Sequence, residues 1–376
     1  MKPAFEKKGA RVMGPGCRVA IVAVTPSGFA LASRLAAAWG ERGGVADVFQ
    51  ADSCAGLSLG ELVRNLWDSY EGLVLIMAVG IAVRVISPLL QSKWTDPAVV
   101  VVDEKGNFAV SLLGGHWGGA NDLARRVGSL LGAVPVITTA TDVWGKTSVD
   151  LLARSWGFLP VPRERVKDVN SALLAGRRVI LYTEWQLPDE FHGGKEFRVI
   201  FGSLSQVRLE QKGGPFVFAT SRKSGDFPAG SLFLCPPSLA AGIGCRRGVS
   251  PEEVEDAVAY ALEQAGRHRD SLVALATHAA KVDELGLRQA ARRMKLPLFF
   301  FSPGVLQMVL QKHQGLQYSQ FVESRMGVGG VCEPAALAAV SEGQLVLPKT
   351  ARGRVTVALA EAGLLWSGSG QVIRRI

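Results

Sequence analysis

Cysteine is scarce in this chain of 376 residues, and its distribution excludes two common uses of the residue. The cysteines are odd in number and widely scattered, and no two of them form a Cys-x-x-Cys pair. This pattern argues against a disulfide framework and against a cysteine-based zinc site. We therefore expect a reducing, cytoplasmic environment and no metal site built by the protein. The five cysteines are Cys17, Cys54, Cys235, Cys245 and Cys332.

Long apolar runs are absent as well. The longest, residues 73–86, is interrupted by Gly80 and Arg84 and is shorter than the roughly 20 residues that a helix needs to cross a bilayer. The first run, residues 19–24, ends in Thr-Pro-Ser-Gly and predicts a buried strand rather than a signal peptide. We expect no membrane association.

The sequence also lacks the His-Glu-x-x-His signature of zinc proteases, the phosphate-binding loop of NTPases and the signature of RNA-recognition domains. What it has is positive charge, because 42 Lys and Arg against 33 Asp and Glu leave a net charge of +9. This excess favours an anionic partner, such as nucleic acid, acidic lipid or a small molecule with several carboxylates or phosphates. Charge alone does not choose among them.

Residues 18–142 alternate Val- and Ile-rich runs with glycine turns and amphipathic segments. Apolar runs without polar alternation are typical of strands buried on both faces, with helices as the covering layers. The turn sequence Asp-Glu-Lys-Gly-Asn at 103–107 predicts a hairpin that reverses one strand. We expect an N-terminal α/β domain over residues 1–143, with an open, mostly parallel sheet and helices on both of its faces.

Two further domains are predicted after this one. Residues 144–238 contain short strand-like pieces between polar turns, which predict a small β-rich α/β middle domain ending in a Cys-Pro-Pro-Ser linker. Residues 239–376 return to long helices and apolar strands and close with a strand pair, which predicts a C-terminal α/β domain. The expected fold class is therefore α/β, in three domains.

The clearest local signal is the stretch Gly-Ile-Gly-Cys-Arg-Arg-Gly-Val-Ser-Pro-Glu-Glu at 242–253. Ser250 and Glu253 predict a capping box, so a helix begins here. The glycines and the pair Arg246 and Arg247 place backbone N–H groups, a helix dipole and guanidinium groups together, which is typical of sites for carboxylates or phosphates. The alternative is a solvated turn.

The second signal is Leu-Leu-Gly-Gly-His-Trp-Gly-Gly-Ala-Asn-Asp at 112–122, a strand end that runs into a helix. Four glycines would let a large ligand approach the backbone, and such loops lie at the carboxyl edge of the sheet, where α/β proteins bind ligands. We predict that His116 is a general acid or base. The alternative is that His116 pins a tight turn while Asn121 caps the helix.

Three other positions are weaker candidates. Arg84 stands inside an apolar run and must find an anion, either a neighbouring carboxylate or a ligand. Thr139 follows a strand and could line the same edge as His116, although hydroxyls there commonly form caps and turns. Lys281 lies on a strand-to-helix loop with two carboxylates, where it could bind a substrate or help to cap a helix.

Six motifs taken together resemble the cobalt-precorrin-5A hydrolase family of anaerobic cobalamin biosynthesis. The resemblance covers nearly the whole chain from about Val19, and the motifs follow the family's order of N-terminal, middle and C-terminal domains. The motifs lie at 80–90 (GIAVRVISPLL), 95–142 (TDPAVVVVDEKGN to VPVITTATD), 242–258 (GIGCRRGVSPEEVEDAV), 276–287 (ATHAAKVDELGL), 333–337 (EPAAL) and 345–349 (LVLPK).

The resemblance implies a reaction on a cobalt-bound tetrapyrrole with many carboxylate side chains. The enzyme would open the δ-lactone on ring A and release acetaldehyde, giving cobalt-precorrin-5B. Cobalt arrives in the substrate, so no cofactor and no metal from the protein are implied. Lactone hydrolysis needs an activated water and donors for an oxyanion, roles that His116 and the N–H groups of Gly118 and Gly119 could fill. The candidate substrate-binding residues are Arg84, Gly115, Gly118, Gly119, Asn121, Thr139, Gly244, Arg246, Arg247, Lys281 and Glu333.

Two departures and two alternatives accompany this expectation. Trp117 stands where relatives are expected to have an aliphatic residue, and His278 interrupts a segment expected to be acidic or aliphatic, so both could tune substrate fit.

A carrier that binds the corrinoid without catalysis is the alternative function, and a nucleotide-dependent oxidoreductase is disfavoured because no complete dinucleotide fingerprint is present. We expect an anionic cobalt-tetrapyrrole partner and no nucleic acid, and we leave open contact with neighbouring pathway enzymes and a homodimer.

Overall fold

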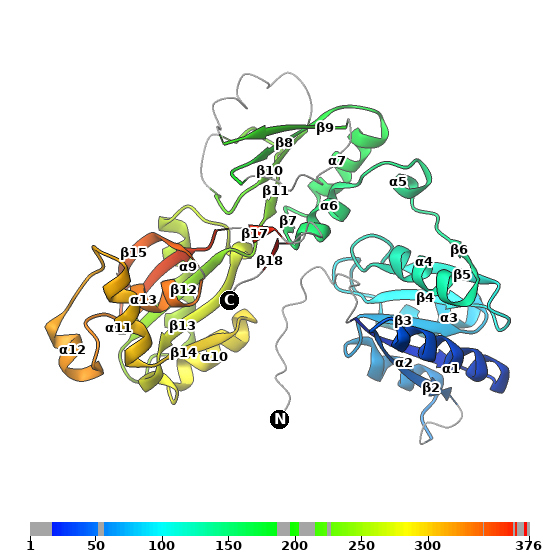
Figure 1. The fold of residues 1–376 in the computed structure, drawn as a ribbon, viewed down its shortest axis with the longest axis horizontal. Helices are drawn as coiled ribbons and strands as arrows, with labels where there is room; N and C mark the ends of the chain where they lie inside the picture. The colour runs from blue at the N-terminus through cyan, green and yellow to red at the C-terminus, as the bar shows by residue number, and fades with distance from the viewer. Residues whose placement is uncertain are drawn as a thin grey trace. The chain divides into compact units, whose positions relative to one another are not determined.

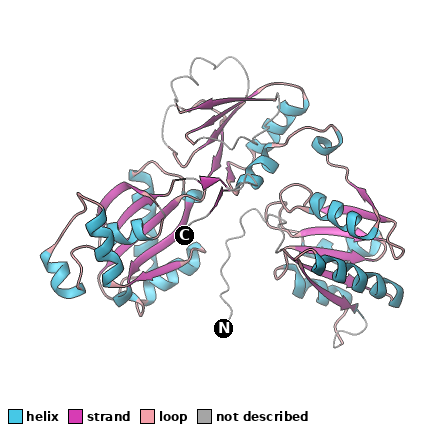
Figure 2. Ribbon diagram, in the orientation of Figure 1, coloured by secondary structure: helices cyan, strands magenta, loops and turns pink. Residues whose placement is uncertain are grey.

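The computed structural model describes residues 17–51, 56–185, 196–202, 215–223, 227–340, 342–363, 365–366 and 372–373. Internal contacts divide the described chain into two compact units. The first unit comprises residues 17–155 with the short segment 173–176, and the second comprises residues 156–172 and those from 177 onward. These units contain the three main sheets that are labelled in Figure 1 and coloured magenta in Figure 2.

The first unit is built on a six-stranded sheet with the order β2-β1-β3-β4-β5-β6. Its Val- and Ile-rich strands β1, β3 and β4 are parallel to one another and almost completely buried, as their sequences predict. Strand β2 pairs in parallel with β1 at one edge. The strands are β1 (Arg18–Ala23), β2 (Val45–Gln50), β3 (Gly72–Ile76), β4 (Ala98–Val102), β5 (Phe108–Leu113) and β6 (Val134–Val136).

Helices cover both faces of this sheet. One hydrophobic cluster joins α1 (Pro26–Glu41) and α4 (Ala120–Leu131) to alternate residues of β1, β3 and β4. A second cluster joins α2 (Leu59–Trp67) and α3 (Val79–Ile86) to the residues that point the other way. Two layers of helices on one buried sheet are the arrangement that the alternating sequence pattern predicts.

A tight turn reverses the chain between β4 and β5, where the sequence predicts a hairpin. Asp103 accepts hydrogen bonds from the backbone N–H groups of Lys105 and Phe108, and Gly106 adopts a φ of 73°. Strands β4 and β5 are antiparallel, and β6 is parallel to β5. The carboxyl end of β5 therefore lies at the amino edge of β1, β3 and β4.

This reversal corrects the expected position of the loop after β5. We expected residues 114–119 at the carboxyl edge of the sheet, where open α/β sheets bind ligands. Because β5 runs against β4, the loop lies beside the start of β4, and a Cβ added to Gly114 would be 3.1 Å from the carbonyl oxygen of Pro97. The loop after β6 reaches the same edge.

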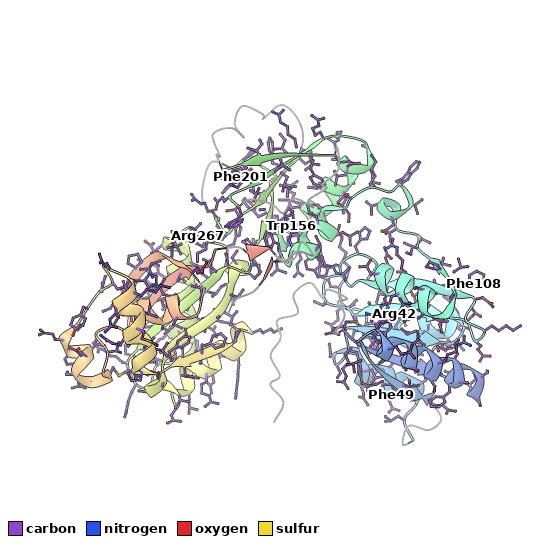
Figure 3. The ribbon with its side chains drawn as sticks, viewed as in Figure 1. Arg42, Phe49, Phe108, Trp156, Phe201 and Arg267 are labelled. Carbon is purple, nitrogen blue, oxygen red and sulfur yellow. The ribbon has the colours of Figure 1, made fainter. Side chains whose placement is uncertain are left out.

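The middle sheet belongs to the second unit and has the order β7-β11-β10-β8-β9. All neighbouring strands are parallel except β7, which is antiparallel to β11. Its core is aromatic, with Tyr182, Phe216 and Phe218 in one cluster, and Phe201 on the edge strand β9 is exposed (Figure 3). The elements are β7 (Leu159–Val161), α7 (Arg165–Leu174), β8 (Val179–Thr183), β9 (Phe197–Phe201), β10 (Phe216–Ala219) and β11 (Leu232–Cys235).

The last sheet has the order β14-β13-β12-β16-β15, with β12, β13 and β14 parallel. Helices α9 and α10 pack on one face, and α11 and α13 pack on the other. The predicted closing strand pair is the antiparallel β15–β16. The elements are β12 (Leu239–Cys245), α9 (Pro251–Gln264), β13 (Leu272–His278), α10 (Leu285–Met294), β14 (Leu298–Phe301), α11 (Pro303–Lys312), α12 (Gln320–Met326), α13 (Cys332–Ala338), β15 (Gln344–Arg352), β16 (Val355–Glu361), β17 (Leu365–Trp366) and β18 (Val372–Ile373).

Hydrogen bonds inside the second unit connect the segment after β10 to the segment after α9. The N–H of Lys223 donates to the carbonyl oxygen of Gly266 at 2.8 Å, and the N–H of His268 donates to that of Ser221 at 2.7 Å. Next to these bonds, Arg267 forms an ion pair with Glu361 (Figure 3). The middle and C-terminal sheets therefore share backbone contacts within one unit.

The predicted fold class is confirmed, because the chain is a mixed α/β protein with three main sheets of mostly parallel strands and helices packed on them. Each main sheet takes its strands from one of the three predicted segments. The domain boundaries at residues 143/144 and 238/239 stay predictions. Among the described helices, none combines the length and the apolar content that crossing a bilayer requires.

Candidate functional site

The loop between β5 and α4 is shaped by its glycines. Gly114 and Gly119 adopt φ values of 72° and 89°, which strain any other residue, and a Cβ added to Gly118 would lie 2.8 Å from the carbonyl oxygen of Gly114. The N–H of Ala120 donates to that same carbonyl at 3.0 Å. The loop therefore folds tightly upon itself, and Gly118 and Gly119 are buried.

These contacts correct the expectation that the glycines leave room for a ligand. The N–H of Gly119, proposed above as an oxyanion donor, already donates to the carbonyl oxygen of His116 at 3.2 Å. Gly115 packs against Asn121 and Thr139, since a Cβ there would be 3.0 and 3.2 Å from their side-chain oxygens. The glycines shape the turn, and a role for them in substrate binding stays a prediction.

His116 lies between two carboxylates. Its Nε2 is 2.8 Å from Oδ2 of Asp142, and its Nδ1 is 3.3 Å from Oδ2 of Asp150. The hydroxyls of Thr141 and Ser148 lie 2.9 and 3.4 Å from the same two nitrogens, and only 10% of the imidazole is exposed. Asp142 comes from α5 (Ala140–Val143) and Asp150 from α6 (Val149–Trp156), so the ring joins three separate segments.

The two carboxylates favour the charged form of this imidazole. Burial lowers the pKa of His116, but the hydrogen bonds and charges of Asp150 and Asp142 together raise it by more, so the pKa lies above that of an ordinary histidine. Burial raises the pKa of Asp142, and Arg125 and His116 lower it by more, so this carboxyl group stays ionised. The site therefore favours an imidazolium, which when formed directs one N–H at each aspartate.

A second ring of side chains surrounds the imidazolium. Arg154 is almost fully buried, and its Nη1 donates to the carbonyl oxygen of His116 at 3.0 Å and to Asp122 at 2.9 Å. Arg125 forms ion pairs with both Asp122 and Asp142. Asp122, Asp142 and Asp150 thus lie among cationic side chains that include Arg125, Arg154 and the protonated imidazole.

The predicted candidates Asn121 and Thr139 belong to this network. The Asn121 amide donates to Asp142 at 2.9 Å and to the Thr139 hydroxyl at 3.0 Å, and its oxygen accepts from Ser111 at 2.7 Å. Asn121 is buried, so the structure brings these residues to His116 as hydrogen-bond partners. The expected cap by Asn121 is wrong, because Asn121 lies inside α4, whose N-cap is Gly119 without a side-chain hydrogen bond. The role of His116 as a general acid or base stays a prediction.

Sequence analysis missed Asp150, Arg154 and Arg125 as members of this site. Asp150 and Arg154 are four residues apart on α6 and so share one face of that helix, but the start of this helix was not predicted to include Asp150. Asp142 lies in a segment that sequence analysis did place at the same edge as His116. Its contact with the imidazole depends on β6 being parallel to β5, which brings the two loops together.

A second group of candidates meets at the carboxyl edge of β12 and β13. Gly244 ends β12, Arg246 and Arg247 follow it, and Lys281 follows β13, which is the parallel neighbour of β12. Both arginines are exposed, and neither forms an ion pair with any residue that the structure describes. Lys281 is near enough to Cys245 to lower its pKa, although burial outweighs this and the thiol pKa is raised.

The helix start beside these arginines is built as predicted. Ser250 accepts a hydrogen bond from the N–H of Glu253, whose carboxylate accepts from the N–H of Ser250 at 2.9 Å, so the capping box is confirmed. Glu253 also binds Arg354 at 2.7 Å. Arg354 is thereby neutralised, whereas the charges of Arg246 and Arg247 remain available to an anion.

Arg84 and Glu333 lie in surroundings that sequence analysis did not foresee. Arg84 is exposed on the outer face of α3 and forms no ion pair within the described chain, so burial does not force it to find an anion. Glu333 is buried, and its two oxygens accept from the N–H of Gln317 at 2.6 Å and of Lys349 at 2.8 Å. Glu333 therefore holds a loop and β15 in place and is not presented to a ligand.

The two departures from the family pattern are both packed inside. Trp117 is buried and contacts Trp94 edge to face, with 5.0 Å between ring centroids. His278 is buried at the end of β13, where its Nδ1 accepts from the N–H of Ala280 at 3.0 Å, and burial lowers its pKa. Both side chains support their loops from within.

One hydrolase-like pattern is a helix cap. Residues 56–60 read Gly-Leu-Ser-Leu-Gly, which matches the Gly-x-Ser-x-Gly pattern that carries the nucleophile of many hydrolases. Ser58 instead caps α2, because its side chain accepts from the N–H of Glu61 and its hydroxyl donates to the Glu61 carboxylate at 2.7 Å. Its hydroxyl partner is a carboxylate of the same capping box, so no histidine-activated serine forms here.

No cluster of three His, Cys, Asp or Glu side chains suited to a metal ion occurs among the residues that the structure describes. Cys17, Cys235, Cys245 and Cys332 form no disulfide within the described residues, and Cys54 lies outside them. The expectations of no protein metal, no protein cofactor and a reducing compartment stay predictions.

Three family models match the chain in order. They are Cobalamin synthesis G N-terminal over residues 61–142, Cobalamin biosynthesis central region over 147–236 and Cobalamin synthesis G C-terminus over 239–360. A Salmonella typhimurium protein named cobalt-precorrin-5A hydrolase is 34% identical over 347 residues, which cover 92% of this chain and 97% of that protein. The chain belongs to the cobalt-precorrin-5A hydrolase family.

A second curated relative agrees with this assignment, and one solved structure is similar in sequence to part of the chain. A Priestia megaterium protein named cobalt-precorrin-5A hydrolase is 33% identical over 306 residues, which cover 80% of each chain. A solved structure of cobalamin biosynthesis protein chiG from Agrobacterium tumefaciens is 33% identical and covers 33% of this chain and 98% of that one, with a TM-score of 0.28. The resemblance that the sequence motifs carried is confirmed, and the chain has a role in cobalamin biosynthesis.

We expect the charge on His116 to make the stability of the chain depend on pH. The folded state raises the pKa of His116, so its contribution to the free energy of unfolding is complete below the ordinary pKa of about 6.5 and is lost as the pH rises through the folded value. Over that window the wild-type chain should lose up to about 1.4 kcal/mol per pH unit relative to His116→Gln. Urea unfolding at a series of pH values measures the difference.

The matched control is His313→Gln, because His313 takes no part in the network around Asp142 and Asp150. This variant should keep the slope of the wild-type chain. If His116→Gln also keeps that slope, the two aspartates do not hold a charge on the imidazole.

Proposed function

We propose that the protein opens the ring-A δ-lactone of cobalt-precorrin-5A and releases acetaldehyde, giving cobalt-precorrin-5B in anaerobic cobalamin biosynthesis. The observation that carries the proposal is the 34% identity, over 92% of the chain, to a curated protein named for this hydrolysis. The net charge of +9 also suits a substrate with many carboxylates.

The reaction balances without an added oxidant or reductant. Water adds to the lactone carbonyl carbon, the ring C–O bond breaks, and a carboxylate and an alcohol result. The alcohol then loses its proton, the C–C bond to the macrocycle breaks, and the carbon leaves as acetaldehyde with its methyl group. The electron pair of that bond passes into the conjugated ring, which takes up a proton.

We infer that His116 supplies a proton in this reaction and does not act as the base. Asp142 and Asp150 favour the charged imidazole, and a general base would need a neutral ring with a free nitrogen. Both N–H groups donate to carboxylates in the structure, so one of these hydrogen bonds must open when the proton is delivered. Asp142 is the partner on the more accessible side, since it also binds the half-exposed Arg125.

The test is anaerobic incubation of the purified full-length protein with cobalt-precorrin-5A. We expect release of acetaldehyde in equal amount to the lactone consumed, and a fall of about 10²-fold in that rate for His116→Gln, the usual scale for loss of a general acid. A corrinoid carrier, the alternative function, would change the absorption spectrum of the ligand and release no acetaldehyde. That second result would contradict the proposal.

We further propose that Arg246 and Arg247 bind carboxylates of the substrate. They are exposed, they have no ion pair within the described chain, and they precede the capped start of α9. Replacing both with Gln should raise the KM for cobalt-precorrin-5A at least about tenfold and change kcat much less. Gly244 and Lys281, at the same strand ends, would assist this binding.

The control for the arginine pair is Arg292→Gln combined with Arg288→Gln, two cations on α10 in the same unit. This double variant removes the same charge and should leave the KM within about twofold of the wild-type value. An equal rise in KM for both double variants would show that substrate binding responds to the net charge of the protein and not to Arg246 and Arg247 in particular.

Contact with neighbouring pathway enzymes and a homodimer stay predictions.

A further inference from the structure

The turn that carries Arg246 and Arg247 is exposed, yet hydrogen bonds hold it on both sides. It links β12 to α9, and Arg246, Arg247 and Gly248 are all exposed. The N–H of Arg246 donates to the carbonyl oxygen of Arg354 at 3.1 Å, and Nη2 of Arg354 donates to the carbonyl oxygen of Gly248 at 3.0 Å. The residue just before β16 therefore fixes one side of the turn.

A carboxylate holds the other side of the turn. The N–H of Gly248 donates to Oε1 of Glu284 at 2.9 Å. Glu284 is the N-cap residue of α10, but its side chain makes no capping hydrogen bond to that helix. A side chain at this position normally accepts from the first turn of its own helix. The side chain of Glu284 therefore serves the turn after β12 rather than α10.

A glycine allows α10 to come close enough for this bond. A Cβ added to Gly286 would lie 1.9 Å from the carbonyl oxygen of Val249, so any other residue there would force α10 or the turn to move. Gly286 is two residues after Glu284, and Val249 follows Gly248. The close packing of α10 on the turn and the hydrogen bond of Glu284 are thus adjacent parts of one contact.

The charge of Glu284 is the wrong sign for an anion-binding site. Burial raises the pKa of the Cys245 thiol most, Lys281 lowers it and Glu284 raises it further, so both charges lie near the strand end that leads into the turn. A carboxylate here repels the carboxylates that the two arginines are proposed to bind. Glu284 therefore opposes anion binding through its charge and can favour it only through its hydrogen bond to Gly248.

We propose that Glu284 is a positioning residue for substrate binding, which holds the N–H of Gly248 and so keeps Arg246 and Arg247 in the conformation that binds substrate carboxylates. This inference rests on the proposed function of the two arginines and names the residue that orders them. A turn that is ordered before the ligand arrives loses less conformational entropy on binding, and the ligand binds more tightly. Glu284 itself does not touch the substrate.

The test exploits the opposite signs that charge and position predict. Glu284→Ala removes a negative charge, which by itself would tighten the binding of an anion, and removes the hydrogen bond to Gly248, which should weaken it. Cobyrinic acid, a cobalt corrin with free carboxylates, is the probe, and its Kd for the full-length protein is measured by absorbance titration. We expect Glu284→Ala to raise Kd at least about threefold.

Two further substitutions at Glu284 separate the charge from the hydrogen bond. Glu284→Gln keeps an oxygen that accepts from Gly248 and loses the charge, so the probe should bind at least as tightly as it binds the wild-type chain. Glu284→Asp keeps the charge, but its side chain is one methylene shorter and loses the bond. It should raise Kd at least as much as Glu284→Ala.

The matched control is Asp283→Ala, which removes the same charge from the adjacent residue. Asp283 is exposed, and its side chain forms no hydrogen bond or ion pair within the described chain. This variant should leave Kd unchanged or lower it. The order of the turn is measured directly by hydrogen exchange at the Gly248 amide, which should be at least about threefold faster in Glu284→Ala than in Asp283→Ala.

With cobalt-precorrin-5A as substrate, the same variants should separate binding from catalysis. Glu284→Ala should raise KM at least about threefold and leave kcat within about twofold of the wild-type value, because the turn binds carboxylates and not the reacting atoms. Circular dichroism checks the fold of every variant. A merely structural role for Glu284 would lower the unfolding temperature without the rise in KM and without rescue by Gln.

Two results would overturn the inference. One is a Kd for Glu284→Ala equal to or below that of Asp283→Ala, and the other is a loss of affinity in Glu284→Gln as large as that in Glu284→Ala. The double variant Arg246→Gln with Arg247→Gln is measured alongside them. If it alone binds the probe weakly, only the positioning role fails, whereas if it binds as the wild type does, the proposed role of the arginines fails as well.

Discussion

The imidazolium of His116, held between Asp142 and Asp150, is the interaction on which the candidate site depends. It joins the loop after β5, the short helix α5 and the start of α6. Arg154 from α6 and Arg125 from α4 add cations that form ion pairs with the aspartates. A buried charge cluster of this kind is costly when one member is removed, because the remaining charges lose their partners. The geometry of the loop therefore depends on the protonation of the imidazole, and a change in one is expected to change the other.

Much of the fold follows from local sequence, and the rest depends on contacts between distant residues. The Val- and Ile-rich strands, the hairpin at Asp103 and the capping box at Ser250 were predictable because each needs only neighbouring residues. The position of the His116 loop was inferable but was predicted wrongly, since the predicted hairpin already requires β5 to run against β4. Asp150 as a partner of His116 and Glu333 as a buried clamp depend on how α6 and β15 pack, and no local pattern encodes that packing.

The net charge of the chain is less informative than the location of its unpaired cations. On and around α9, the cations Arg293, Arg352 and Arg354 are bound by Glu252, Asp256 and Glu253 and contribute little to an external field. Arg246, Arg247 and Arg84 have no such partner within the described chain. A polycarboxylate substrate would be attracted by these residues in particular.

The central claim, that His116 is an imidazolium held by two carboxylates, is tested most directly by nuclear magnetic resonance of the wild-type chain with ¹⁵N-labelled histidine. Recorded across a pH titration, both ring nitrogens of His116 should be protonated at neutral pH, and the midpoint should lie above the ordinary value of about 6.5. Asp150→Asn should move that midpoint downward. A wild-type ring that is neutral at pH 7, with one unprotonated nitrogen, would contradict the account.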